Sequence, residues 1–135
     1  MNLVLDSSVV LSALLADEQG EYASLIIGRL KRCEVYGVVP SLFFMEAANG
    51  LLMAHRRQRV GQDTLILLLQ TLSIMPFERI ETPDILQTTA LAQKHTLTVY
   101  DATYLSIALR GGFPLASLDS ALQRAALAEG IFYQP

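Results

Sequence analysis

Apolar residues form two kinds of segment along the chain. Short runs that are apolar throughout are typical of strands buried on both faces of a parallel sheet. They predict strands at residues 2–6, 34–39, 73–77, 114–117 and 131–133. Longer segments, in which apolar residues recur every three or four positions, predict helices. These helices are expected at residues 8–15, 20–33, 42–59, 61–72, 84–95, 101–109 and 119–130.

Residues with strong positional preferences mark several of these helix ends. Ser41 is a favourable N-cap for the third helix, and Pro83 suits the first turn of the fifth. Gly111 and Gly112 stop the sixth helix, and Gly130 stops the last. The alternation of strands and helices predicts an α/β fold with a parallel sheet, and 135 residues are enough for a single domain, residues 1–135. Ligands of such sheets bind beyond the carboxyl ends of the strands.

The composition is 52% hydrophobic and 17% charged, which is more apolar than an average soluble chain. Excess apolar surface has to be covered, so we expect a homo-oligomer or a protein partner. No apolar run reaches the roughly 18 residues that cross a membrane. The start, "MNLVLDSS", lacks the basic region of a signal peptide, and the single cysteine, Cys33, excludes an intrachain disulfide. These features favour a cytoplasmic protein.

Ten basic and thirteen acidic residues give a net charge of −3, so bulk charge does not attract nucleic acid. An enzyme acting on nucleic acid would need a local basic patch and metal ions. The densest basic cluster, residues 55–59, contains Arg56, Arg57 and Arg59. These arginines are candidates for RNA contacts, and a solvated helix end that suits the helix dipole is the alternative.

Three aspartates follow predicted strands or extended runs. Asp6 interrupts an apolar run, Asp119 follows the strand 114–117, and Asp101 follows the short extended run 97–100. Because carboxyl ends of parallel strands share one edge of the sheet, these acids are expected at the same place. Each also precedes a helix, and capping that helix is an alternative role.

Glu46 has no such alternative. It is predicted to lie more than one turn inside the helix of residues 42–59, too deep to cap it, on a helix that is apolar on most sides. No Lys or Arg stands three or four residues away to pair with it. We therefore expect Glu46 to face the sheet edge where the aspartates meet, with a simply exposed helix face as the alternative.

Four carboxylates in one cleft repel one another unless cations lie between them. Oxygen ligands without His or Cys select a hard cation, so Mg²⁺ or Mn²⁺ is expected at Asp6, Glu46, Asp101 and Asp119. Ser8 and Ser117 could order a ligand or a water molecule there, or make only local turn hydrogen bonds.

The stretches "VLDSSV", "FFMEAANGL", "YDATYLSIAL" and "LASLDSALQRAA....GI" resemble, in order and spacing, the motifs of PIN-domain ribonucleases, and among them the VapC toxins of toxin–antitoxin pairs. The resemblance covers nearly the whole chain. It implies that the same four acids bind one or two divalent cations and cut single-stranded RNA by metal-assisted hydrolysis. Asn49 matches a polar position that the family often keeps after its glutamate.

The resemblance also implies a three-layer α/β/α fold, a five-stranded sheet in the order 3-2-1-4-5, a homodimer, and inhibition by a small antitoxin protein. Apolar helices around Phe43, Phe44 and residues 65–69 are candidate surfaces for both contacts. A non-catalytic module that binds RNA or protein, with the acids only capping helices, is the alternative function. The target RNA, and the choice between a toxin and a housekeeping nuclease, stay open.

Overall fold

Parallel strands form the central sheet of the structure, a computed structural model that describes residues 1–81 and 84–135. The strands are β1 (Asn2–Leu5), β2 (Tyr36–Pro40), β3 (Glu78–Ile80) and β4 (Leu115–Ala116). Their order is β3-β2-β1-β4, and every neighbouring pair is parallel. The predicted α/β fold class is confirmed.

The third strand lies further along the chain than predicted. It is β3 at residues 78–80, whereas residues 73–77 end α4 and form the connection to β3. Pro76 has no N–H to give to a strand ladder. The Phe77 ring instead packs edge-on against Phe43, with ring centroids 5.6 Å apart. Of the apolar run, only Met75 and Phe77 pack against the core, and Ile74 is 80% exposed. A polar segment forms the edge strand.

The predicted fifth strand is reduced to a single bridge. Leu115 of β4 pairs with Phe132 in parallel, and the Leu115 N–H donates to the Ile131 carbonyl at 2.8 Å. The described residues thus contain a four-stranded sheet in the predicted order, and the bridge continues it beyond β4. Residue 132 is the only one of residues 131–133 in a bridge, although the Tyr133 N–H also donates to the Leu115 carbonyl at 2.9 Å.

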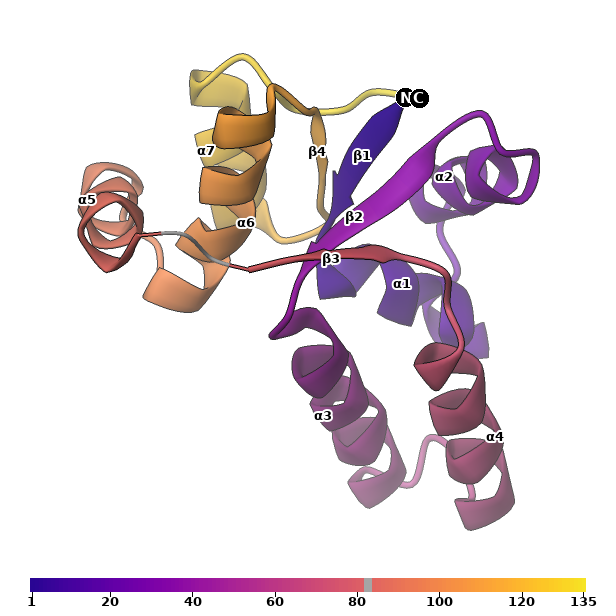
Figure 1. Cartoon of the computed structure of the whole chain (residues 1–135). Coiled ribbons are helices and arrows are strands. Elements are labelled where there is room, and N and C mark those ends of the chain that lie inside the picture. Colours follow the sequence, from indigo (N-terminus) through magenta and orange to yellow (C-terminus); the bar gives the residue numbers. More distant parts are fainter. Residues whose placement is uncertain (82–83) are drawn as a thin grey trace.

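Helices cover both faces of the sheet (Figure 1). In Figure 1, α6 and α7 lie on one side, with α5 outside α6, and α1 and α2 lie on the other. Helices α3 and α4 pack together and extend from the end of the sheet as a separate lobe. The helices are α1 (Ser7–Leu14), the 3-10 turn η1 (Ala16–Glu18), α2 (Glu21–Lys31), α3 (Phe43–Arg56), α4 (Gln62–Ser73), α5 (Ile85–His95), α6 (Val99–Gly111) and α7 (Ser120–Ala128).

The ends of α3 differ from the prediction. Leu42, not Ser41, is the N-cap residue, and no side chain caps this helix. The Ser41 hydroxyl instead donates to Glu81 Oε1 at 2.6 Å, across to the connection after β3. The helix ends at Arg56, so residues 57–59 belong to the turn that leads to α4. The later start puts Glu46 in the first turn of the helix, and the earlier end puts Arg56 in its last turn.

Of the other predicted helix ends, one lies outside the described residues, one is shifted and two are confirmed. Pro83 lies outside the described residues, and Asp84 caps α5 by accepting from the N–H of the second residue of the helix, at 2.8 Å. Thr98 caps α6, so the expected extended run 97–100 ends two residues early. Gly112 and Gly130 have φ angles of 66° and 72°, which glycine adopts without strain. Both are confirmed as helix stops.

The core lies on both faces of the sheet. Helix α6 packs on β1, β2 and β4 on one face, and buried residues of α1, α2, α3 and α4 belong to the same core. Two residues predicted for contact surfaces are part of this interior: Phe43 is fully buried and Leu65 is 6% exposed. Ile66 and Leu67 of α4 are the exposed apolar residues in that region. Within the described ranges, no helix combines the length and the apolar character that a membrane crossing requires.

Candidate active site

The carboxyl ends of β1 and β4 come together at one edge of the sheet. The Asp6 N–H donates to the Ala116 carbonyl at 3.1 Å, which ties the two strand ends. Asp6 follows β1 directly, and Asp119 follows β4 after two residues. Parallel pairing thus brings together two acids that are far apart in the sequence, as their positions after strands predict.

Asp6 is buried at this edge, with only 5% of its surface exposed. It occupies the N-cap position of α1, but its side chain makes no cap hydrogen bond. Instead, Oδ2 accepts hydrogen bonds from the Ser8 hydroxyl at 2.6 Å and from the Ser117 hydroxyl at 2.8 Å. The capping alternative is therefore wrong for the Asp6 side chain.

The two serines connect Asp6 to the loop that carries Asp119. The Asp119 N–H donates to Ser117 Oγ, and the Leu118 N–H donates to Ser8 Oγ, both at 2.9 Å. Ser117 is completely buried. Each hydroxyl thus donates to a carboxylate and accepts from a backbone amide, which fixes its orientation. These bonds reach across the sheet edge, so they are more than local turn hydrogen bonds.

Asp119 does cap a helix. Its Oδ2 accepts from the Leu122 N–H in the first turn of α7, at 2.9 Å. One carboxylate oxygen is used in this bond, and the second oxygen has lone pairs of its own. Asp119 is exposed, on the open side of the group. Capping and a role in the site are compatible for this residue.

Glu46 approaches from α3. Because α3 begins at Phe43, Glu46 lies in its first turn, and the expectation that it lies deeper is wrong. It nevertheless does not cap the helix: its Oε1 accepts a hydrogen bond from the Tyr104 hydroxyl at 2.5 Å. Tyr104 is fully buried on α6, so this bond ties the lobe of α3 to the body of the fold.

Asp101 lies in the first turn of α6, half-buried. Its N–H donates to the hydroxyl of the cap residue Thr98 at 3.0 Å, so Thr98, and not Asp101, caps the helix. The capping alternative is therefore wrong for Asp101 as well. Negative side chains in a first helical turn are favoured by the helix dipole.

The four carboxylates influence one another. Burial raises the pKa of Asp6, and repulsion from Asp119 adds to this, while the two serine hydrogen bonds act in the opposite direction. Burial also raises the pKa of Glu46 and of Asp101, with repulsion from the neighbouring acids as a smaller cause. Repulsion of this kind requires proximity, so the structure brings the predicted acids into one group.

No salt bridge within residues 1–81 and 84–135 involves any of these four acids. The group is therefore negative and is not neutralised by the described chain. Across the same residues, no three His, Cys, Asp or Glu side chains stand close enough to chelate one ion as they are placed. Mg²⁺ keeps several waters and needs only one or two direct carboxylates, so a closed cage is not required. An oxygen-only, uncompensated donor set fits a hard divalent cation.

Two residues of the site were missed by the sequence reasoning. Tyr104 orients Glu46, and Thr98 begins the helix that carries Asp101. Tyr104 lies three residues after Asp101 and therefore on the same side of α6. This spacing is the one local feature of the sequence that could have indicated Tyr104 as a site residue. Nothing local indicates that its hydroxyl meets a glutamate 58 residues away.

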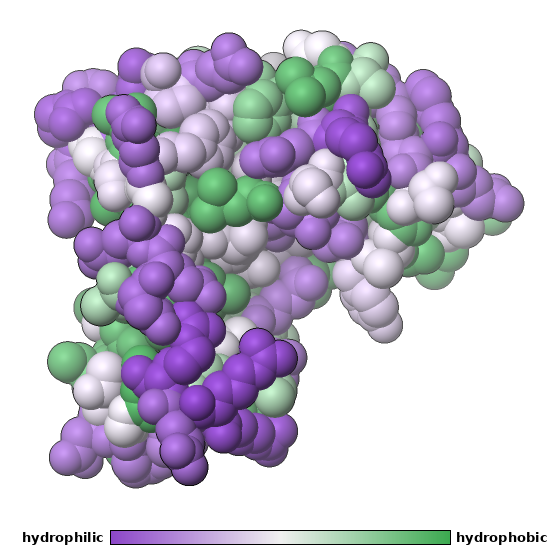
Figure 2. All heavy atoms as spheres, turned by 180° about the vertical axis from the view of Figure 1, so that it is seen from behind, coloured by the Kyte–Doolittle hydropathy of each residue, from purple (hydrophilic) through white to green (hydrophobic). Residues whose placement is uncertain are grey.

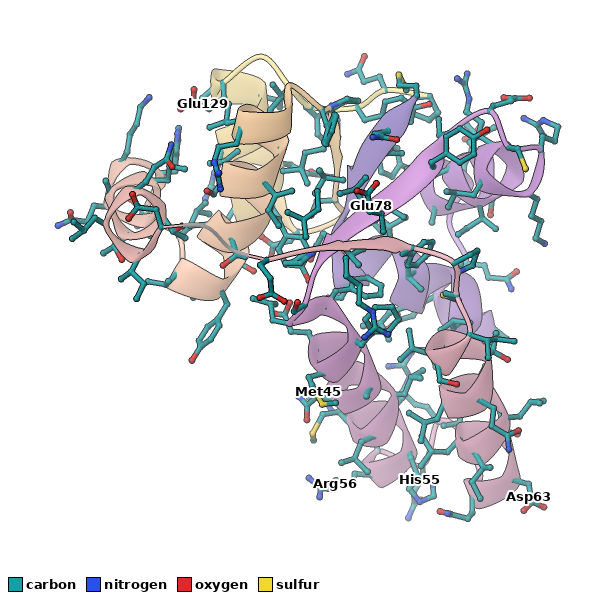
Figure 3. The ribbon with its side chains drawn as sticks, in the orientation of Figure 1. Met45, His55, Arg56, Asp63, Glu78 and Glu129 are labelled. Atoms are coloured by element: carbon teal, nitrogen blue, oxygen red, sulfur yellow. The ribbon has the colours of Figure 1, made fainter. Side chains whose placement is uncertain are left out.

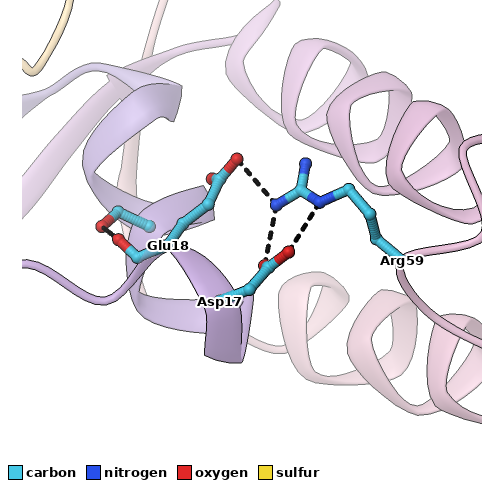
Figure 4. A network of polar contacts seen from close by, with 4 residues as sticks. Asp17, Glu18 and Arg59 are labelled. Carbon is cyan, nitrogen blue, oxygen red and sulfur yellow. Dashed lines mark hydrogen bonds and ion pairs between the residues drawn. The ribbon is translucent and has the colours of Figure 1, made fainter.

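The remaining candidates make no hydrogen bond or ion pair with the four acids among the described residues. Asn49 is exposed and makes no side-chain hydrogen bond with the part of the chain that the structure describes. Arg56 is at the far end of α3 from the sheet (Figure 3). Arg59 donates to Asp17 and also pairs with the neighbouring glutamate of η1, at 2.8 Å for each ion pair (Figure 4). Its charge is used to hold the turn after α3 against η1.

Comparison with known proteins gives one family and two similar structures. The family model described as PIN domain matches residues 3–127. The crystal structure of PAE2754 from Pyrobaculum aerophilum is 25% identical, with a TM-score of 0.72 over 93% of this chain and 79% of that one. The crystal structure of FitAcB from Neisseria gonorrhoeae shares the fold at 16% identity, with a TM-score of 0.66 over 92% of both chains. No curated protein sequence matches the chain.

Proposed function

Because the chain belongs to the PIN domain family, we propose that it is a divalent-metal-dependent endoribonuclease that cuts single-stranded regions of RNA. The observation that carries this proposal is the meeting of Asp6, Glu46, Asp101 and Asp119, from four separate elements, without a compensating cation among the described residues. A packing role does not account for such a group, because uncompensated carboxylates destabilise the fold that brings them together.

We assign each of these four acids, and the hydroxyl groups bonded to them, a role in the proposed reaction. Asp6 and Asp101 would be the direct ligands of Mg²⁺ or Mn²⁺, and Glu46 and Asp119 would complete the site or orient the attacking water. Such an ion would supply Lewis-acid charge to a phosphate and favour ionisation of a water molecule. The serine hydroxyls hold Asp6 in one orientation. The Tyr104 hydroxyl holds Glu46 toward the same edge.

The proposal is tested with a single-stranded RNA substrate in the presence of Mg²⁺ and in excess EDTA. Cleavage should require the metal and should be lost in Asp6→Asn and Asp101→Asn with the far-ultraviolet spectrum unchanged. Asp63→Asn is the matched control, because Asp63 is an exposed acid at the far end of α4 (Figure 3). Equal cleavage by all four proteins would identify a contaminant and contradict the proposal.

The alternative that the sequence leaves open is a non-catalytic module that binds RNA or protein. Titration with Mn²⁺ in a calorimeter separates the two. Saturable binding that Asp6→Asn weakens supports the nuclease. A flat titration, together with retained RNA binding, supports the module.

We further propose that the protein is the toxin of a toxin–antitoxin pair, acts in the cytoplasm, and is a homodimer inhibited by a small antitoxin. Exposed apolar side chains on α5, Ile85 at 82% and Leu86 at 81%, are surface that a partner would cover. Expression should arrest growth, and the product of a small adjacent gene should relieve the arrest. A monomer on sizing at micromolar concentration would contradict the dimer. Growth arrest that no adjacent gene product relieves would indicate a housekeeping nuclease.

A further inference from the structure

The open side of the acidic group has an apolar rim. Three of the four acids reach solvent, and in the sequence an exposed apolar side chain stands directly before each of them. The pairs are Met45 with Glu46, Tyr100 with Asp101, and Leu118 with Asp119. Met45 is 76% exposed, Tyr100 68% and Leu118 40%. Single exposed apolar residues are common, but each of these three directly precedes an acid of the group in the sequence.

The rim borders a re-entrant corner of the molecule. In Figure 1, α3 and the start of α6 stand on the two sides of this corner, and Figure 2 shows from behind that the lobe of α3 and α4 is set off from the body. In Figure 3, Met45 lies on the side of α3 that faces α6. Tyr100 is in the first turn of α6, on the opposite side. A chain that crosses the acidic group therefore passes these side chains.

Charge limits how the protein can hold RNA at this rim. No Lys or Arg lies within three residues of Glu46, Asp101 or Asp119 in the sequence. The cations of the α3 end are distant: Arg56 is ten residues after Glu46, or about 15 Å along the helix axis. Arg79 is an exception, because its guanidinium lies 4.1 Å from the centroid of the Phe44 ring, two residues before Glu46 in α3. The rim side chains Met45, Tyr100 and Leu118 are uncharged, so they can contribute only nonionic contacts. The flat faces of unpaired bases are the apolar part of a single-stranded RNA.

We propose that Tyr100 is a stacking platform for an unpaired nucleobase beside the phosphate held at the acidic group. This inference rests on the proposed nuclease function and adds a base-binding position to it. Aromatic side chains bind bases of single-stranded nucleic acid by stacking, largely without regard to sequence. Paired bases are stacked within their helix and offer no free face. The position of Tyr100 next to Asp101 thus accounts for a preference for single strands.

The test measures binding of a single-stranded RNA that carries one 2-aminopurine, whose fluorescence falls on stacking, with Ca²⁺ in place of Mg²⁺ and a gel to confirm intact RNA. Tyr100→Leu keeps the apolar bulk and removes the ring, and Tyr100→Phe keeps the ring. Tyr36→Leu is the matched control, because Tyr36 is 56% exposed at the amino end of β2, the opposite edge of the sheet.

Tyr100→Leu should lose the quench and bind the RNA roughly 5- to 150-fold more weakly. Tyr100→Phe and Tyr36→Leu should behave as the unmodified protein. Unchanged quenching and affinity in Tyr100→Leu would overturn the base site while leaving nuclease activity, measured separately, intact. Quenching without any cleavage would support the base site and fail the proposed function. Loss of inhibition by a partner protein, with RNA binding retained, would overturn the proposal in favour of a protein contact at the rim.

Discussion

Removing the Ser117 hydroxyl tests whether the site depends on one buried hydrogen-bond relay. This hydroxyl donates to Asp6 Oδ2 at 2.8 Å and accepts from the Asp119 N–H at 2.9 Å. A hydrogen bond to a charged group stabilises by about 1.5–3 kcal/mol, and a partly buried N–H left without a partner costs about 1 kcal/mol more. Ser117→Ala should therefore lower the free energy of unfolding by about 2–4 kcal/mol in metal-free buffer.

The chain offers a matched control for this substitution. Ser106 on α6 is also completely buried, but its hydroxyl has no hydrogen-bond partner among the described residues. Ser106→Ala removes the same atom at the same burial and breaks no bond. It should leave the free energy of unfolding unchanged or raise it by about 1 kcal/mol, since a buried unpaired hydroxyl is itself unfavourable.

Urea denaturation followed by circular dichroism, in EDTA near neutral pH, compares the two variants. A difference of at least about 2 kcal/mol between them is expected. Combining Ser117→Ala with Asp6→Asn should give less than the sum of the single effects, by about 1 kcal/mol, because both remove the same interaction. If Ser117→Ala and Ser106→Ala agree within about 0.5 kcal/mol, the relay does not stabilise the site and the reasoning from these distances is refuted.

Three further predictions concern charge and positioning. Burial raises the pKa of Asp6 above its ordinary value of 3.8, so the folded metal-free protein binds more protons than the unfolded chain just above that pH, and its stability must fall as pH rises there. In EDTA, the free energy of unfolding of the unmodified protein, relative to that of Asp6→Asn, should decrease from about pH 4 upward. Added Mg²⁺ should reverse this decrease. A difference between the two proteins that does not change with pH would contradict the raised pKa of Asp6. Tyr104→Phe should weaken Mn²⁺ binding about 10-fold in calorimetry by freeing Glu46, with the fold retained; an unchanged affinity would show that the bond does not position the glutamate. Arg59→Ala should lower the urea midpoint of unfolding, whereas Arg57→Ala, at an exposed position, should not. Equal midpoints for the two variants would argue against the tie to η1.

Local patterns in the sequence were sufficient for the α/β class and led to the four candidate acids, whereas the strand order came from the family resemblance. Strand and helix periods are properties of neighbouring residues, so they indicate β1, β2, β4 and seven helices close to their observed places. Parallel strands put their carboxyl ends on one edge, which is why acids after β1 and β4 could be expected together. The prediction failed where position in the sheet overrides the pattern. The apolar run at 73–77 ends α4 and connects it to the sheet, with only Met75 and Phe77 packed against the core. The polar residues of β3 are tolerated because β3 is the outermost strand of the sheet.

Only the tertiary structure decided how the acids are held. Asp6 accepts a hydrogen bond from Ser117, which is 111 positions away in the sequence. Glu46 accepts one from Tyr104, which is 58 positions away. Arg59 pairs with Asp17, 42 positions away, so it does not stay free for RNA. Such pairings depend on which helix faces meet once the chain has folded, and no local period encodes them. The sequence thus determined which residues carry the charge. The packing of the helices against the sheet determined the hydrogen-bond partners of the acids and the burial that raises the pKa of Asp6, Glu46 and Asp101.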